Sequence, residues 1–305
     1  MRVVVSGRWS SVQDLPTLLV AQLTGIGICP IIVKHNFKRL WEKFGRVLWC
    51  RIVHVVSIKP CGIEGAFWVL CFIFLRVIGK KVIVHWIGTD VLELTPSFGY
   101  WFSKLGSVHL SQAPWLVEEL GAKGVKSTWI PILPSLSAVH KPLPETLTVL
   151  TYLGGDESRN DFYGKNEAEK LIRGFPDVNF LILGRVSEED KLDLPNANYL
   201  GFVEHKGMGD VYSSSTVLLR LTKHDGLSLM VLEALNHGRY VIWTKDFPYC
   251  YMVENSSEAK EYLEMLRGVR LINEGGLKLI DNDFNNIKWA NKLVGVYREV
   301  VGDKC

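Results

Sequence analysis

Short apolar runs alternate with longer amphipathic stretches along the first half of the chain. Runs rich in β-branched residues predict strands at residues 2–6, 28–33, 53–57, 81–85, 108–111 and 127–130. Helices are predicted between them, near residues 12–24, 36–45, 62–79 and 113–121. Buried strands that alternate with helices indicate β-α-β units, in which the strands form a parallel sheet.

The same alternation starts again in the second half. Strands are predicted at residues 148–153, 179–183, 198–200, 217–221 and 240–244, and helices near residues 165–173, 207–214, 227–237 and 258–267. Between the halves, residues 131–144 hold four prolines and no regular period, which is typical of a linker. The pattern therefore predicts an α/β fold with two Rossmann-like, doubly wound domains and a ligand cleft between them.

The predicted domains are residues 1–145 and residues 146–283. Residues 284–301 have an amphipathic helical pattern. For the C-terminal segment 284–305, packing back on the N-terminal domain is one option.

Composition narrows the class of protein further. The chain has 305 residues, of which 48% are hydrophobic, so a disordered chain is excluded. Its six cysteines form no C-x-x-C pair, which argues against a zinc site or a redox motif. The longest uncharged run, residues 15–33, is interrupted by prolines and glycines and is not a convincing membrane span. We expect a reduced, cytoplasmic protein without a signal peptide.

Charge is distributed unevenly between the halves. Residues 1–145 carry 16 Lys/Arg and 8 Asp/Glu, a net +8, whereas residues 146–305 carry 19 and 24, a net −5. The first domain is therefore expected to face an anionic partner, such as a membrane surface or a phosphorylated acceptor. No nucleic-acid motif accompanies the charge, so nucleic acid is not the expected partner.

The predicted helix at residues 62–79 is hydrophobic on nearly every side. That pattern favours a buried packing helix. The alternative is a peripheral membrane contact, which neighbouring cations would support. These cations are Lys59, Arg76, Lys80 and Lys81.

Residues 217–244 carry the most informative pattern for chemistry, which runs strand, loop, helix, glycine, strand. The loop that opens the helix consists of Asp225, Gly226, Leu227 and Ser228. Backbone N–H groups in the first turn of a helix lack intrahelical partners and can bind a phosphate. Glu233 follows Gly226 by seven residues, about 10 Å along the helix, where its carboxylate could accept hydrogen bonds from ribose hydroxyls. The alternative is that Glu233 is merely solvated on an exposed helix face.

This stretch resembles a known family. D-x7-E, from Asp225 to Glu233, is similar to the E-x7-E signature of the retaining GT-B glycosyltransferases (glycosyltransferase family 4-like), and E-A-L-N-H-G-R-Y-V-I continues the match. Upstream, the segments containing Arg185 and Val203 resemble the strand ends beside the nucleotide base. The resemblance implies a hexosyltransferase that uses a UDP- or GDP-linked sugar as substrate and retains the anomeric configuration. Asp225 departs from the motif by being one methylene shorter than glutamate.

A second element places cations after a glycine-rich loop. Arg159 precedes, and Lys165 begins, a predicted helix, where two cations can hold a diphosphate and stabilise it as it leaves. The family resemblance implies that such cations replace a metal ion. Neither a metal nor a separate cofactor is therefore expected. The alternative is that Arg159 and Lys165 are ordinary surface residues.

In the first half, the strand at residues 81–85 ends on His85 and runs into a loop that contains Asp90. Polar groups at the carboxyl end of a strand meet ligands in doubly wound folds. His85 is a candidate to bind a sugar hydroxyl and Asp90 to orient or deprotonate an acceptor, although a structural role for either is an alternative. Gly7 and Arg8 follow the first strand and match the family's acceptor loop.

The sequence thus predicts a sugar transfer from a nucleotide-sugar to an acceptor hydroxyl, with His85, Asp90 and Lys165 as catalytic candidates. The acceptor is expected to be anionic or lipid-linked, and the protein to work in the cytoplasm, in one version at the inner face of the membrane. Two other functions stay open. One is a non-catalytic nucleotide-sugar binding protein, and the other is a sugar-nucleotide epimerase of the same fold.

Overall fold

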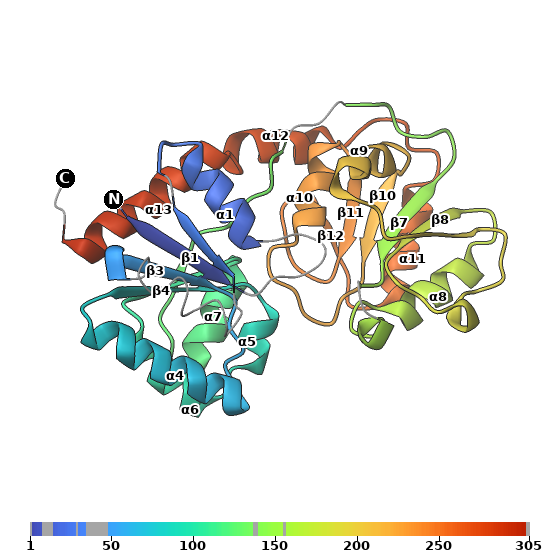
Figure 1. Cartoon of the computed structure of the whole chain (residues 1–305). Coiled ribbons are helices and arrows are strands. Elements are labelled where there is room, and N and C mark those ends of the chain that lie inside the picture. Colours follow the sequence, from blue (N-terminus) through green and yellow to red (C-terminus); the bar gives the residue numbers. More distant parts are fainter. Residues whose placement is uncertain are drawn as a thin grey trace. The chain divides into compact units, whose positions relative to one another are not determined.

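The protein is described by a computed structural model that covers residues 2–7, 15–28, 30–34, 48–136, 140–154 and 157–302 (Figure 1). The chain forms two compact units. Unit 1 comprises Met1–Ser135 and Asn285–Cys305, and unit 2 comprises Leu136–Phe284. The first crossing between them falls within the proline-rich segment 131–144, and the C-terminal helix belongs to unit 1.

Unit 1 is built on a sheet of six parallel strands in the order β2-β1-β3-β4-β5-β6. The strands are β1 (Val3–Gly7), β2 (Ile31–Lys34), β3 (Ile52–Val56), β4 (Lys81–Trp86), β5 (Val108–Ser111) and β6 (Thr128–Trp129). Strand order reverses between β1 and β3. In open α/β sheets such a switch point is where ligands bind, at the carboxyl ends of the strands.

Helices cover both faces of this sheet (Figure 1). They are α1 (Leu15–Thr24), α4 (Gly62–Val77), α5 (Thr89–Glu93), α6 (Pro96–Leu105), α7 (Pro114–Ala122) and α13 (Asn286–Val301). The pattern did not predict α5 or α6. Helix α6 is set by local signals instead, since Thr95 caps it by accepting from the Phe98 N–H and Pro96 occupies its first turn. The helix predicted near residues 36–45 lies outside the described residues.

Helix α4 corrects the prediction of a helix buried on every side. Only one face packs inward, through Gly65, Phe72 and Leu75. On the opposite face Ile63 is 90% exposed and Leu70 is 66% exposed. The buried-helix interpretation is wrong for that outer face, since the contacts of α4 with α6 and β4 leave it exposed.

Unit 2 contains a second sheet of six parallel strands, in the order β12-β11-β10-β7-β8-β9. The strands are β7 (Thr148–Tyr152), β8 (Asn179–Leu183), β9 (Ala197–Gly201), β10 (Val217–Arg220), β11 (Tyr240–Trp243) and β12 (Tyr251–Met252). The order reverses between β7 and β10, which makes their carboxyl ends the expected ligand site of this unit.

The helices of unit 2 also lie on both faces of its sheet. They are α8 (Lys165–Gly174), α9 (His205–Ser213), α10 (Leu229–Asn236), α11 (Ser256–Met265) and α12 (Glu274–Asp283), with short 3-10 turns η1 (Glu157–Arg159) and η2 (Glu188–Asp190). Helices α8 and α11 pack on one face in a core that includes Val149, Leu171 and Leu263. The predicted fold of two doubly wound α/β domains is confirmed.

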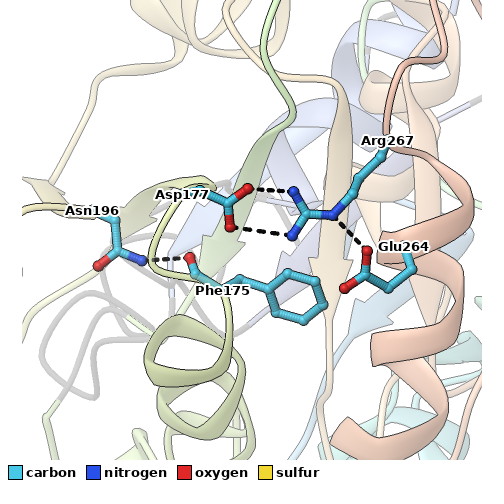
Figure 2. A network of polar contacts seen from close by, with 5 residues as sticks. All are labelled: Phe175, Asp177, Asn196, Glu264 and Arg267. Atoms are coloured by element: carbon cyan, nitrogen blue, oxygen red, sulfur yellow. Dashed lines mark hydrogen bonds and ion pairs between the residues drawn. The ribbon is translucent and has the colours of Figure 1, made fainter.

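A polar network, shown in Figure 2, ties α11 to the segment that enters β8. Arg267 holds both carboxylate oxygens of Asp177 and also donates to Glu264, while its guanidinium lies 5.3 Å from the centre of the Phe175 ring. Asn196 donates to the Phe175 carbonyl at 2.9 Å. The network lies at the amino ends of the strands, away from the expected ligand site.

Candidate functional site

A charged residue lies at the switch point of unit 2. Arg220 ends β10, is 9% exposed, and donates from Nε to Asp225 Oδ2 at 2.5 Å. Its guanidinium also lies 5.7 Å from the centre of the Tyr163 ring. Sequence reasoning missed Arg220, although an arginine that closes the apolar run V-L-L-R was a usable signal. Because Asp225 is held by Arg220, its carboxylate is fixed in orientation and charge-compensated.

Arg159 lies over the same aromatic ring, that of Tyr163. Its guanidinium is 4.8 Å from the centre of the Phe162 ring and 5.3 Å from that of Tyr163. Tyr152, at the end of β7, contacts Tyr163 edge-on. The structure therefore brings the predicted residues Arg159 and Asp225 together around Tyr163, at the carboxyl ends of β7 and β10.

Lys165 begins α8 directly after a close backbone contact. Gly164 has φ +83°, and a Cβ there would lie 2.2 Å from the carbonyl oxygen of Leu221, so only glycine fits. The Lys165 side chain is 15% exposed, with Nζ 3.2 Å from Asp190 and 3.8 Å from Glu169. Its hydrogen bond lowers the pKa of Asp190. The lysine is thus positioned near the switch point but already shares its charge with two carboxylates.

Helix α10 offers its first turn at the end of the Asp225 loop. Gly226, Leu227 and Ser228 are buried, and Ser228 is the N-cap residue. Within the described residues, the Ser228 hydroxyl makes no capping hydrogen bond. The N–H groups of this turn are therefore not satisfied by the side chain that usually caps them, as an anion-binding helix terminus requires.

Glu233 is buried in the middle of α10, with 6% of its surface exposed. The solvated alternative is wrong for this residue. Tyr212 donates its hydroxyl to Oε2 at 2.7 Å, and His205 Nε2 lies 3.1 Å from Oε1. The hydrogen bond to Glu233 raises the pKa of His205, while burial and the neighbouring Glu233 carboxylate raise the pKa of Tyr212. A carboxylate oxygen can accept more than one hydrogen bond, which is the property that a contact with ribose hydroxyls uses.

Tyr212 and His205, both from α9, were not predicted as site residues. Arg185 and Val203 were, and they follow β8 and β9. Arg185 is exposed and its backbone N–H donates to the Gly154 carbonyl at 2.9 Å, whereas Val203 is half-buried. The strand order places β8 and β9 on the far side of the switch point from α10.

In unit 1, His85 lies inside the core rather than on a surface. It is fully buried on β4, and its Nδ1 lies 3.3 Å from His54 Nε2, while His54 Nδ1 lies 2.6 Å from the Tyr297 hydroxyl. Burial lowers the pKa of His85 to about 3 and also lowers that of His54. Both imidazoles are therefore neutral at pH 7. Sequence reasoning missed His54 and Tyr297, since only the fold brings β3 and α13 beside β4.

Asp90 orders the loop in which it lies. Its carboxylate is 3% exposed and accepts from the backbone N–H groups of Ile87, Gly88 and Val91 at 2.9–3.2 Å. Burial raises its pKa to about 6 even though these donors oppose the shift. This geometry is that of a loop-stabilising carboxylate, which is the structural alternative for Asp90.

Gly7 ends β1 and pairs with Val56, so it lies at the carboxyl end of β1 beside the switch point of unit 1. Arg8 lies outside the described residues. In the described ranges, no group of three or more His, Cys, Asp or Glu side chains is placed to hold a metal ion. Nor does any helix of the described chain combine the length and apolarity needed to cross a bilayer.

Comparison with known proteins places the fold. No protein-family model matches the sequence, and no curated protein matches it. Among solved structures, sucrose-phosphate synthase from Thermosynechococcus elongatus is similar over 100% of both chains, with a TM-score of 0.73 at 12% identity. The chain has the GT-B fold.

Two further structures are similar. A GtfA/B complex gives a TM-score of 0.59 at 14% identity, over 86% of this chain and 60% of that one. The pneumococcal O-GlcNAc transferase GtfA, solved with UDP and GlcNAc, gives 0.51 at 15% identity, over 82% and 57%. At these identities the GT-B similarity is one of fold, and function has to be argued from the site.

Proposed function

We propose that this protein is a glycosyltransferase that moves a sugar from a UDP- or GDP-linked donor to an acceptor hydroxyl. The observation that supports this most is the buried Glu233, on the helix whose uncapped first turn opens at the switch point of unit 2. In this proposal the N–H groups of that turn bind the diphosphate, and Glu233 accepts hydrogen bonds from the ribose hydroxyls. Arg185 and Val203 lie beside the base.

The proposed chemistry depends on charge at the leaving diphosphate. Arg159 and Lys165 supply two cations beside the switch point, and cations aimed at developing charge lower the barrier most. We propose that they make a divalent metal and any separate cofactor unnecessary. Attack on the same face of the sugar as the leaving group would give retention, and the acceptor proton would pass to the departing phosphate oxygen.

Unit 1 is proposed to present the acceptor, through Gly7 at the end of β1, through Arg8 and through the loop that follows β4. His85 is fully buried beside His54, so it is better suited to supporting the end of β4 than to contacting a sugar hydroxyl. Asp90, with its oxygens held by backbone amides, is better suited to shaping the loop than to taking a proton. The net charge of +8 on residues 1–145 supports an anionic acceptor. We propose that this acceptor is lipid-linked.

One observation favours a second function. Asp225 occupies the position of the first acid in the family motif. Its carboxylate forms an ion pair with Arg220, so it is not positioned primarily for a ligand. A nucleotide-sugar binding protein without transferase activity would tolerate that arrangement. Donor turnover separates the two functions, since a binding protein would hold the donor intact.

The test is calorimetric titration with a panel of UDP- and GDP-sugars. Glu233→Gln, which keeps the side-chain shape, should weaken the tightest ligand by about 1.5–3 kcal/mol, the range for hydrogen bonds to a charged group. Glu261→Gln, on an exposed position of α11, is the matched control and should bind as wild type. An unchanged Kd in a folded Glu233→Gln variant would contradict the assignment of the donor site.

A further inference from the structure

The outer face of α4 is apolar along its whole length. Ile63, Leu70 and Val77 recur every seven residues, or about two turns, so they share one side of the helix. Their side chains are 90%, 66% and 79% exposed. Ile73 and Phe74 add partly exposed apolar surface to the same stripe. An apolar stripe of this length facing water on a packed domain marks an interaction site.

Cations gather at the C-terminal end of this stripe. Arg76 donates to the Lys104 carbonyl at 2.6 Å, which brings the exposed residues Arg76 and Lys104 together. Lys80 donates to the carbonyls of Leu48 and Cys50, and Lys81 is exposed beside it. We call the five apolar residues and four cations together the α4 surface.

Acidic charge is scarce on this helix. Its only acid is Glu64, and Glu64 lies 3.7 Å from Lys59. The partner of the α4 surface should therefore combine an apolar layer with negative charge. A second copy of this chain would supply an apolar stripe with the same excess of cations, so it lacks the negative charge that this requirement includes.

We propose that the α4 surface docks on the anionic surface of a lipid bilayer. A helix with an apolar face lies in the plane of the interface, with that face buried among the acyl chains and its cations near the headgroups. Tyr100 and Trp101 on the neighbouring α6 are also half exposed, and aromatic side chains favour the interface. The inference deepens the lipid-acceptor part of the proposed function, on which it rests, and it places that acceptor beside unit 1.

The experiment is flotation of the full chain with vesicles of phosphatidylcholine alone or with 30% phosphatidylserine, at low and high salt. Wild type should bind the anionic vesicles, with binding falling as salt screens the cations. Leu70→Ser/Val77→Ser should reduce binding on the order of tenfold or more. Arg76→Gln/Lys81→Gln should reduce it by about 25-fold on anionic vesicles only, since each surface cation is worth roughly fivefold.

The matched control is Ile287→Ser, which removes a similarly exposed apolar side chain from α13 of the same unit and should bind as wild type. All substituted side chains are exposed, so the variants should fold. Negligible wild-type binding to both vesicles would overturn the proposal, as would a Leu70→Ser/Val77→Ser variant that binds normally. Dimers that form in wild type and are lost in that variant, without vesicle binding, would identify a second copy instead.

These vesicles contain no acceptor and no nucleotide-sugar, so binding is measured apart from transfer. Glu233→Gln should bind them as wild type. If the donor assignment fails while vesicle binding persists, the membrane-binding role of the α4 surface is supported and the proposed function is rejected. If vesicle binding fails while donor binding persists, the membrane proposal is rejected and the proposed donor site is kept.

Discussion

Acidification from pH 7 to pH 5 should destabilise unit 1, because its core contains buried histidines that are neutral in the folded state. Burial lowers the pKa of His85 to about 3 and that of His109 to about 4. In the unfolded chain both residues return to a pKa of about 6.5. The unfolded state therefore binds protons that the folded state excludes, so the free energy of unfolding must fall as the pH falls below about 6.5.

The magnitude follows from these values. Between pH 7 and pH 5 each histidine should remove about 2 kcal/mol from the free energy of unfolding, since one pKa unit corresponds to about 1.4 kcal/mol. Asp90 acts in the opposite direction, because its raised folded pKa of about 6 makes the folded state take up a proton in this range. Protonation of Asp90 should add about 1 kcal/mol to the free energy of unfolding over this range, so the net decrease is about 2–3 kcal/mol. His54, whose pKa is also lowered, adds to the loss.

The assay is urea unfolding at pH 7 and pH 5, followed by tryptophan fluorescence. Nine of the ten tryptophans belong to the residue ranges of unit 1, and Trp243 alone belongs to unit 2, so the signal reports mainly on unit 1. His109→Gln should reduce the pH-dependent loss by about 2 kcal/mol, whatever its effect at pH 7. His205→Gln, in unit 2, is the control and should leave the loss unchanged. A free energy of unfolding that is equal or greater at pH 5 would refute the reasoning.

Three further predictions concern unit 2. Lys165→Ala should lower kcat on the order of 100-fold and change KM much less, because charge on the leaving diphosphate grows in the transition state. Steady-state kinetics in which only KM rises would make the lysine a ground-state contact. Gly164→Ala should cost at least about 2 kcal/mol of stability in urea unfolding, since its left-handed backbone and the Leu221 carbonyl both oppose a Cβ. Gly174→Ala, which meets open space at the end of the same helix, should be close to neutral, and equal effects would contradict this account. Dialysis against EDTA should leave transfer activity intact, and a loss that Mg²⁺ or Mn²⁺ restores would show that a metal is required.

Much of the fold follows from local pattern. The strand segments at residues 81–86, 108–111, 148–152 and 179–183 were predicted within a residue, because a fully buried strand in a parallel sheet must be apolar on both faces. Helix α6 escaped prediction because its signals are a cap and a proline rather than a period. The outer face of α4 was misjudged for a related reason. Apolar residues show that a surface avoids water, but not which neighbours cover it.

Candidate residues for the donor site could also be chosen from the sequence, since Glu233 and the loop before α10 are adjacent in the chain. Their partners could not. Arg220 and Tyr163 are separated by 57 residues, and His54 and Tyr297 by 243. Such pairs depend on strand order, which no local pattern records.

The sequence by itself determined that this chain forms two sheets of parallel strands, because the alternation of apolar runs and helices is a local property with a fixed period. Only the tertiary structure decided that Asp225 is paired with Arg220, that Glu233 is shared by Tyr212 and His205, and that His85 is sealed in a core. The physical reason is that hydrogen bonds and burial depend on distances in space. Those distances are set by the register and order of strands that lie far apart along the chain.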